Sequence, residues 1–239
     1  MWFISEKVTV RDSGLMEGFC DHHCHLLPGV DDGVQEVDET LRVLREWQSV
    51  GVQEVWLTPH IMEDIPNEPA ELKRRFEELK KVYNGSITLK LAAEHMMDGL
   101  FLRRLGADEV LPIGTDGTRL LVETSYYIPP MNMEAIIDSI RKNGYDPLLA
   151  HPERYQYMEK DDYRRWKERE VLLQLNLPSL VGAYGPEVQY KAEWLLREGM
   201  YDCSGTDTHS EDQMELFLDG VISKKVVKKV HRLMMEGAL

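Results

Sequence analysis

The sequence predicts an α/β protein built on parallel strands. Short apolar runs alternate along the chain with longer stretches whose apolar residues recur at helical spacing. Strands joined by helices lie parallel, so their carboxyl ends meet at one edge of the sheet. A chain of 239 residues suits one large domain, because barrels of this class reach about 250 residues as a single unit. We therefore expect residues 1–239 to form one domain around a parallel sheet, either open or closed into a barrel.

The first expected strand spans residues 19–25 and reads F-C-D-H-H-C-H. Alternation along a strand places Asp21, His23 and His25 on one face. Burying two imidazoles and a carboxylate side by side costs free energy unless a charge or a ligand compensates them. A metal ion would do so. The alternative is a pair of ordinary surface histidines at the edge of a sheet.

Turn and helix signals divide the next part of the chain. The turn P-G-V-D-D-G brings Asp31 and Asp32 back toward the end of the first strand. Gly51 is a plausible stop for the helix that follows, and Pro69 lies near the first turn of the next one. The elements expected up to residue 105 are a helix at 34–50, a strand at 54–58, a helix at 68–83, a strand at 87–93 and a helix at 99–105.

The same alternation continues to the end of the chain. The expected elements are a strand at 119–122, a helix at 133–142, a strand at 147–150, a helix at 161–169, a strand at 171–175, a helix at 186–198, a strand at 201–205 and a closing helix from 211 onward. Gly144 caps the first of these helices, and Pro186 opens the third. Residues 1–18 give weaker signals. They are expected to form an N-terminal arm of uncertain structure, in which residues 8–10 suit a short strand.

Composition narrows the classes of partner. The chain has 42 acidic and 28 basic residues and a formal net charge of −14, which disfavours a broad contact with a nucleic-acid backbone. No segment approaches eighteen uninterrupted apolar residues, and the N-terminus lacks the pattern of a signal peptide. Three cysteines without the spacing of a secreted scaffold favour a reducing compartment. We expect a cytoplasmic protein that neither binds nucleic acid nor inserts into a membrane.

Most of the expected strands end in a residue that can bind a metal. These strand-end residues are His23 with His25, His60, Glu94, Glu123, His151, and Asp207 with His209. Each alone has an ordinary alternative, such as a loop position, a helix cap or an ion pair with an arginine. Together with Asp32 they give nine N or O donors at one edge of the sheet. Nine donors suit two or three ions, and the five imidazoles among them favour manganese, iron or zinc over calcium or magnesium.

These residues lie in motifs that carry a family resemblance. The motifs D-x-H-x-H-x-x-P-G-x-D-D-G, T-P-H, L-A-A-E, L-V-E-T, A-H-P-E-R-Y and G-T-D-T-H follow one another along the chain. From residue 21 to about residue 210 the chain resembles the PHP (polymerase and histidinol phosphatase) superfamily, and within it the CpsB/YwqE group of bacterial metal-dependent protein-tyrosine phosphatases. The resemblance implies a distorted seven-stranded (β/α) barrel with a trinuclear site, with Mn²⁺ favoured over iron or zinc.

The resemblance also implies roles for single residues. His23, His25 and Asp207 resemble ligands of a first metal, Glu94 a bridging carboxylate, Glu123 and His151 ligands of the neighbouring position, and Asp32, His60 and His209 the remaining ligands. Arg154 matches an arginine expected to contact the phosphate, and its alternative role is an ion pair with a nearby carboxylate. Many relatives have a further arginine soon after the last D-x-H motif, but Ser210 and two acidic residues stand there in this chain. Phosphate anchoring is therefore expected to rest mainly on Arg154.

The remaining polar residues are expected outside the chemistry. Strand alternation points Cys24 away from the metal-binding edge, and the C-x5-R loop of cysteine-dependent tyrosine phosphatases is absent. A Cys/His zinc knot of Cys24 with Cys20 and His22 is the weaker alternative. The residues expected in packing or structural roles, or in solvent, are Cys203, His22, His95 and His231. Tyr126 and Tyr127, close to Glu123 in the sequence, are expected either to wall the pocket or to pack.

The predicted reaction is hydrolysis of a phosphate monoester. Divalent ions lower the pKa of a bridging water, the hydroxide attacks phosphorus in line, and the metals with Arg154 offset the growing negative charge. The residues alone indicate only a phosphate ester. The resemblance implies a phosphotyrosine protein as substrate, namely a bacterial tyrosine autokinase of capsule or exopolysaccharide biosynthesis. The alternatives are a histidinol-phosphate phosphatase or other PHP-type hydrolase, and a non-catalytic metal-binding regulator.

Overall fold

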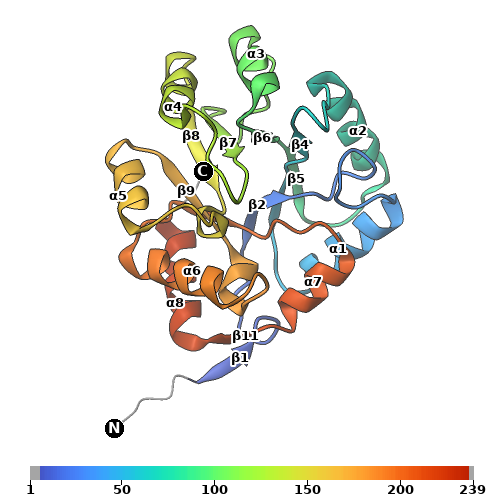
Figure 1. The fold of residues 1–239 in the computed structure, drawn as a ribbon. Coiled ribbons are helices and arrows are strands. Elements are labelled where there is room, and N and C mark those ends of the chain that lie inside the picture. The colour runs from blue at the N-terminus through green and yellow to red at the C-terminus, as the bar shows by residue number, and fades with distance from the viewer. Residues whose placement is uncertain (1–5, 237–239) are drawn as a thin grey trace.

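A curled parallel sheet forms the centre of the molecule, and helices cover its outer side (Figure 1). The computed structural model describes residues 6–236. Its parallel strands are β2 (Cys20–Cys24), β3 (Glu54–Leu57), β4 (His60–Ile61), β5 (Thr88–Leu91), β6 (Glu94–Met96), β7 (Arg119–Glu123), β8 (Asp146–Ala150), β9 (Leu172–Asn176) and β10 (Cys203–Gly205). Hydrogen-bonded ladders join them in the orders β2-β3-β5 and β10-β9-β8-β7-β6-β4. The predicted parallel α/β architecture is therefore confirmed.

Two expected strands are each followed by a further short strand that the sequence did not predict. Residues 54–58 and 87–93 were expected as single strands that end before His60 and Glu94. Instead, β3 and β5 pair with each other, and their continuations β4 and β6 form a new ladder that begins at His60 opposite Glu94. Pro59 separates β3 from β4 and has no backbone N–H to donate to a ladder. His60 and Glu94 thus open short strands, which corrects their expected position just beyond strand ends.

Individual hydrogen bonds, and no regular ladder of the described residues, join β2 to the chain just after β10. The backbone N–H groups of Thr206 and Asp207 donate to the carbonyl of His23 at 3.2 and 2.7 Å. An isolated bridge pairs Cys24 with Thr208, and the backbone N–H of His25 donates to the carbonyl of Thr208 at 2.9 Å. Among the described residues the parallel strands therefore form two separate ladders whose sheet curls round on itself. The curled sheet brings the carboxyl ends of β2, β7, β8 and β10 to one edge. The starts of β4 and β6 lie at the same edge.

Helices follow the strands almost as expected up to the tail. They are α1 (Val37–Ser49), α2 (Pro69–Val82), α3 (Gly99–Ala107), α4 (Met133–Lys142), α5 (Lys160–Glu168), α6 (Pro186–Glu198), α7 (Glu211–Leu218) and α8 (Lys224–Glu236), with 3₁₀ turns η1 (Pro152–Arg154) and η2 (Leu177–Val181). The expected single closing helix is wrong, because strand β11 (Val221–Ser223) separates α7 from α8. None of the helices among residues 6–236 is both long and apolar enough to cross a membrane.

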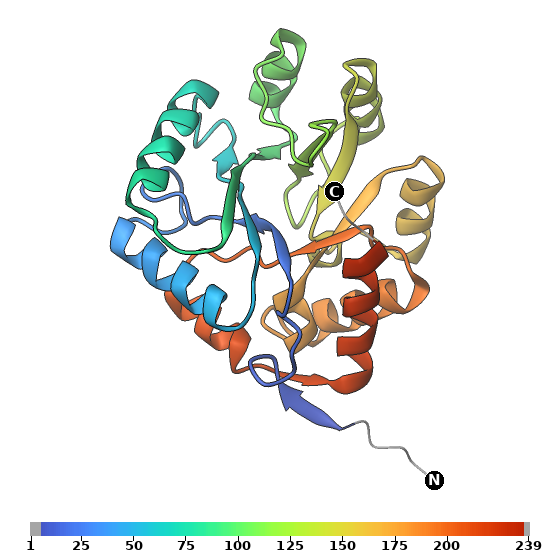
Figure 2. The ribbon, with the colours of Figure 1, turned by 180° about the vertical axis from the view of Figure 1, so that it is seen from behind.

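The N-terminal arm is part of the fold. Strand β1 (Lys7–Thr9) pairs antiparallel with β11, and this small sheet lies below the parallel sheet in both views (Figures 1 and 2). Arg11 then forms ion pairs with Glu46 of α1 and Glu215 of α7. Of the arm expected at residues 1–18, residues 1–5 lie outside the described part. Within residues 6–18, β1 and Arg11 contact α1, α7 and β11 and so join this segment to the C-terminal part of the fold.

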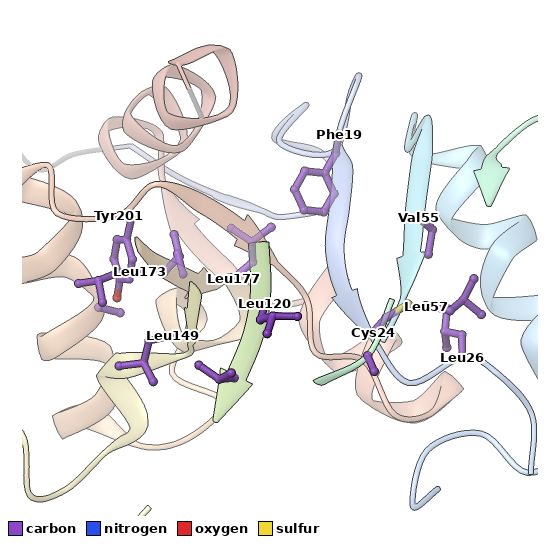
Figure 3. Close-up of a cluster of buried hydrophobic side chains, with 14 of the residues drawn as sticks. Phe19, Cys24, Leu26, Val55, Leu57, Leu120, Leu149, Leu173, Leu177 and Tyr201 are labelled. Atoms are coloured by element: carbon purple, nitrogen blue, oxygen red, sulfur yellow. The ribbon is translucent and has the colours of Figure 1, made fainter. Parts of the chain in front are cut away.

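Apolar side chains from the strands and helices make one main core. Figure 3 shows Phe19 close to β2, Val55 on β3, and Leu149 and Leu173 on β8 and β9 within this cluster. Each of these four side chains is 1% exposed or less. Burial on this scale stabilises the fold by roughly 1.5–3 kcal/mol for each large aliphatic or aromatic side chain. The core fixes the strand positions, and through them the side chains at the strand ends.

Asp21 links β2 to the segment that follows β10. Its carboxylate accepts hydrogen bonds from the backbone N–H and the hydroxyl of Thr206 at 2.8 and 2.6 Å, and from the N–H of His23 at 3.2 Å. Asp21 is 1% exposed, and burial raises its pKa to about 6. The carboxylate predicted beside His23 and His25 is therefore a structural clamp that joins two parts of the sheet.

We expect Asp21→Ala to lower the free energy of unfolding by about 2–4 kcal/mol, because it leaves buried donors of Thr206 and His23 unpaired. Urea denaturation followed by circular dichroism measures the change. Thr206→Val, which removes only the hydroxyl, should cost less. An unchanged unfolding midpoint in Asp21→Ala would contradict this role.

Candidate metal centre

The predicted metal-binding residues come together at one edge of the sheet. Eight of them fall into three groups whose ligand atoms lie within 4.8 Å of one another. The groups are His23, His25, Glu94 and Asp207; His60, Glu94 and Glu123; and His25, Asp32, His60 and His209. Each group shares at least one residue with another. We call this set of residues, together with His151, the cup.

The first group is the most compact. The Nε2 atoms of His23 and His25 lie 3.1 Å apart. Both are 3.3 Å from Oδ1 of Asp207 and 3.2 and 3.4 Å from Oε2 of Glu94. Two imidazole nitrogens and two carboxylate oxygens thus converge from β2, β6 and the chain after β10, which is a donor set suited to a divalent transition metal.

Glu94 and His60 connect the first group to the others. Oε2 of Glu94 lies 3.2 Å from Nδ1 of His60, which is also 3.2 Å from Oε1 of Glu123. Nε2 of His60 lies 3.4 Å from Oδ1 of Asp32, and Nε2 of His209 lies 3.6 Å from the same oxygen. The two ring nitrogens of His60 therefore face different groups.

His151 lies beside these groups and belongs to none of them. Its Nε2 is 3.0 Å from Oε1 of Glu94 and 3.9 Å from Oε2 of Glu123. His151 and Asp207 both have left-handed backbone conformations, with φ of 34° and 53°. Such conformations cost free energy for residues other than glycine and cluster at functional sites. The fold holds both residues in the cup against this local cost.

Three buried carboxylates lie close together in the cup, faced by the imidazoles and by Arg154. Glu94 and Glu123 are 0% and 3% exposed, and Asp207 is 4% exposed. Burial alone would raise the pKa of Asp207, but the charge of His23 and a hydrogen bond from His25 hold the pKa well below its ordinary value. Buried carboxylates of this kind need opposite charge or ligands nearby.

Several polar atoms in the cup have no hydrogen-bond partner. Among the described residues these buried atoms include Nδ1 of His60, Oε2 of Glu94, Oε1 of Glu123 and Nδ1 of His151. Unpaired buried donors and acceptors are uncommon because each costs about 1–3 kcal/mol. The first three of these atoms face one another in the second group. Their arrangement fits a bound metal.

Two residues that the sequence did not assign hold the imidazoles from behind. Asp31 accepts from Nδ1 of His25 at 2.9 Å and from the N–H of His60 at 3.0 Å. Oε1 of Gln174 lies 2.7 Å from Nδ1 of His23. Partners of this kind fix the ring orientation of metal-binding histidines. Gln174 could have been found as a polar residue inside an apolar strand, whereas nothing in the sequence separates the role of Asp31 from that of its neighbour.

Arg154 contacts the cup at Asp207. Its guanidinium donates to Oδ2 of Asp207 at 2.5 Å and lies between the rings of Tyr126 and Tyr184, 4.4 and 4.2 Å from their centroids. Nδ2 of Asn176 joins this arrangement, 3.2 Å from the hydroxyl of Tyr184. The ion pair weighed as the alternative role of Arg154 is present, while its contact with phosphate remains a prediction. Of the two tyrosines, Tyr184 carried no sequence signal.

Glu153 anchors the turn that presents His151 and Arg154. It is 0% exposed, and its carboxylate accepts from the N–H of Asn176 at 3.0 Å, the hydroxyl of Ser179 at 2.8 Å and the hydroxyl of Tyr201 at 2.9 Å. Burial raises the pKa of this carboxyl group. The conspicuous motif A-H-P-E-R-Y thus places an anchor between two residues of the site.

The residues expected outside the site lie outside it. The His22 ring contacts the carbonyl of Ser204, the His95 ring that of Leu121, and the His231 ring that of Gly14. Cys24 donates to the carbonyl of Trp56 and lies in the apolar cluster of Figure 3. Burial raises the pKa of Cys24 well above its ordinary value and also raises that of Cys203, so neither thiol ionises readily.

The fold and the site define a class of protein, and a family model matches the chain. A curled parallel sheet covered by helices, with a His/Asp/Glu cluster at one edge, defines an α/β protein that is able to bind metal. The family model for capsular polysaccharide synthesis, CpsB/CapC, matches residues 19–237. The chain belongs to this family.

The matches to curated relatives cover most of this chain and most of each relative. The tyrosine-protein phosphatase YwqE of Bacillus subtilis is 25% identical over 200 residues, which are 80% of this chain and 77% of the relative. The tyrosine-protein phosphatase CpsB of Streptococcus pneumoniae is 25% identical over 235 residues, 91% of this chain and 95% of the relative. The putative tyrosine-protein phosphatase CapC of Staphylococcus aureus is 23% identical over 214 residues, 87% of this chain and 84% of the relative.

Solved structures share the fold. Structures of YwqE from Bacillus subtilis and CpsB from Streptococcus pneumoniae, described as metal-dependent tyrosine phosphatases, include a chain that matches with a TM-score of 0.76 at 21% identity, over 90% of this chain and 85% of that one. An amidohydrolase from Mycoplasma synoviae matches with a TM-score of 0.51 at 13% identity, over 98% and 87% of the two chains. The fold is thus common to phosphatases and amidohydrolases, and the site must decide between them.

We expect Glu153→Leu to lower the free energy of unfolding by about 3 kcal/mol, because three buried donors lose their acceptor. Glu153→Gln keeps one acceptor oxygen and should cost less. Thermal and urea denaturation measure both changes. A Glu153→Leu protein as stable as the wild type would show that the turn is held by other contacts.

Proposed function

We propose that this protein is a metal-dependent protein-tyrosine phosphatase, a phosphoric monoester hydrolase. The observation that carries the proposal is the cup itself, three overlapping groups of N and O donors in a chain of the CpsB/CapC family. The relatives named as tyrosine-protein phosphatases support phosphotyrosine as the substrate. The family description, capsular polysaccharide synthesis, supports a role in that process. The proposed phosphoprotein is a bacterial tyrosine autokinase of capsule or exopolysaccharide biosynthesis, which is what the PHP resemblance implies.

We infer that the cup holds two to three divalent ions, with Mn²⁺ favoured over iron and zinc. The proposed ligands are His23, His25, Asp32, His60, Glu94, Glu123, His151, Asp207 and His209. Five imidazoles among nine donors favour these metals over calcium or magnesium. Glu94 and His60, each shared by two groups, support adjacent ions. When bound, such ions supply an acidified water and positive charge for phosphoryl transfer.

The chain's own residues position the phosphate. Arg154 offers a planar guanidinium suited to two phosphate oxygens, and the rings of Tyr126 and Tyr184 hold it on both sides. Its ion pair with Asp207 keeps the side chain directed toward the cup. We propose that Arg154 contacts the transferred phosphoryl group and offsets the negative charge that develops on its oxygens.

The finer features of the fold are also proposals. If β3 with β4 and β5 with β6 each count as one interrupted strand, the parallel strands amount to the distorted seven-stranded barrel that the PHP resemblance implies. The single main core supports residues 1–239 as one domain. The three cysteines, none in a disulfide, support a cytoplasmic location.

The amount of metal bound should depend on the residues of the cup. We expect wild-type protein to bind two to three equivalents of Mn²⁺, and His25→Ala to lose at least one because His25 belongs to two groups. His231→Ala, which changes a histidine outside the cup, is the matched control and should bind as the wild type does. Elemental analysis gives the stoichiometry. Bound metal should also raise the thermal midpoint.

The same preparations test the activity. Chelation should abolish hydrolysis of p-nitrophenyl phosphate and added Mn²⁺ should restore it. Full turnover in metal-free protein would refute the mechanism. Turnover of histidinol phosphate without turnover of aryl phosphates would favour the alternative phosphatase, and metal binding without any turnover would favour a regulator.

Arg154→Ala should reduce kcat/KM for p-nitrophenyl phosphate by roughly a hundredfold or more, as for the loss of about 3 kcal/mol of transition-state stabilisation. Metal content should stay intact, and Arg154→Lys should recover only part of the loss. Arg164→Ala changes an exposed arginine of α5 and serves as the control. Wild-type kinetics in Arg154→Ala would remove this residue from the phosphate site.

A further inference from the structure

The loop between β7 and α4 exposes large apolar side chains close to the cup. Tyr127, Ile128 and Met131 are 68%, 71% and 91% exposed. Clustered exposed apolar side chains often mark binding surfaces, whereas isolated ones need no explanation. Pro129 and Pro130 lie between them and fix φ at both positions. The loop therefore presents these side chains to solvent from a stiffened backbone.

A groove of about 520 Å³ adjoins this loop. Its apolar lining includes Pro129, Pro130, Met133, Met158 and Trp166. Its polar lining includes the ion pair between Asp162 and Arg165, at 3.0 Å. The volume lies in the range of roughly 300–1,000 Å³ typical of pockets that hold small ligands, so the groove has room for a few side chains.

A row of aromatic rings connects the groove with the cup. Tyr157 lines the groove, and its hydroxyl lies 2.6 Å from that of Thr124, which follows Glu123 in the chain. The ring of Tyr157 stacks on Tyr155 at 5.6 Å between centroids, and Tyr155 packs edge-on against His151 at 5.7 Å. The other end of the loop is tied down as well, because the carbonyl of Tyr126 accepts from the N–H of Gln156 at 2.8 Å. Packed aromatic side chains thus join the groove to the cup, with the buried Tyr155 between Tyr157 and His151.

We propose that residues 127–131 and this groove bind the polypeptide segment that flanks the phosphotyrosine of a protein substrate, through apolar side chains of that segment. The inference rests on the proposed phosphatase function. A short segment fits better than a second copy of this chain, because three side chains and one groove fall well short of the about 20–30 residues per side in a stable interface. Recognition here adds affinity for protein substrates without touching the reacting phosphate.

Two synthetic phosphotyrosine peptides that differ only in their flanking residues, Leu and Ile in one and Ser in the other, test the proposal. For the wild-type holoenzyme we expect kcat/KM to be at least tenfold higher for the Leu/Ile peptide, mainly through a lower KM. Ile128→Ser/Met131→Ser should remove this preference and leave p-nitrophenyl phosphate turnover unchanged. Val82→Ser/Val221→Ser, which changes two apolar residues that are 53% and 52% exposed on α2 and β11, is the matched control and should retain the preference.

Equal kcat/KM for the two peptides in the wild type would overturn the proposal, as would an equal loss on peptide and p-nitrophenyl phosphate in Ile128→Ser/Met131→Ser. Sedimentation of the same variants decides whether the loop instead joins two copies, since a change in mass with no change in peptide kinetics would also refute the proposal.

If no phosphate ester is hydrolysed, the proposed function fails. Fluorescence anisotropy with labelled phosphonate analogues of the two peptides then still decides docking, because equal affinities would refute it and a tenfold difference abolished by the loop variant would support it.

Discussion

The structure depends on how the buried negative charge at one edge of the sheet is balanced. Glu94, Glu123 and Asp207 are almost fully buried, and among the described residues Arg154 is the one Arg or Lys in an ion pair with any of them. Hydrophobic packing alone does not compensate such charge. Imidazoles surround the carboxylates, and several of their facing atoms have no hydrogen-bond partner. Divalent ions would satisfy the charge and these atoms together.

The fold serves this arrangement by bringing distant segments to one place. The breaks before β4 and β6 let His60 and Glu94 face each other at the start of a new ladder. Just after β8 and β10, His151 and Asp207 have left-handed backbone conformations. Each feature gives up regular ladder bonds or costs local strain. The buried contacts of Asp21 and Glu153 supply the rigidity that keeps these segments in position.

Much of this could be read from the sequence because parallel sheets obey a positional rule. Strand-end residues such as His23, Glu123 and Asp207 needed only the alternation of strands and helices to be assigned to one edge. The short strands β4 and β6 could not be predicted, since the change of pairing partner after β3 and β5 depends on tertiary contacts. Tyr184 and Glu153 were missed for the same reason. Arg154, which packs on the ring of Tyr184, lies 30 residues from it, and the partners of Glu153 lie 23 or more residues away. No local pattern encodes these contacts.

The most direct test of this account is anomalous X-ray diffraction from crystals of the protein grown with Mn²⁺, measured at the manganese absorption edge. We expect two or three anomalous peaks within the cup, with Glu94 between two of them and His25 beside at least one. The same map should place Asp31 and Gln174 behind the histidines without contact to metal. Absence of peaks at the cup under saturating Mn²⁺, or peaks only at surface carboxylates, would contradict the claim that metal ions balance its buried charge.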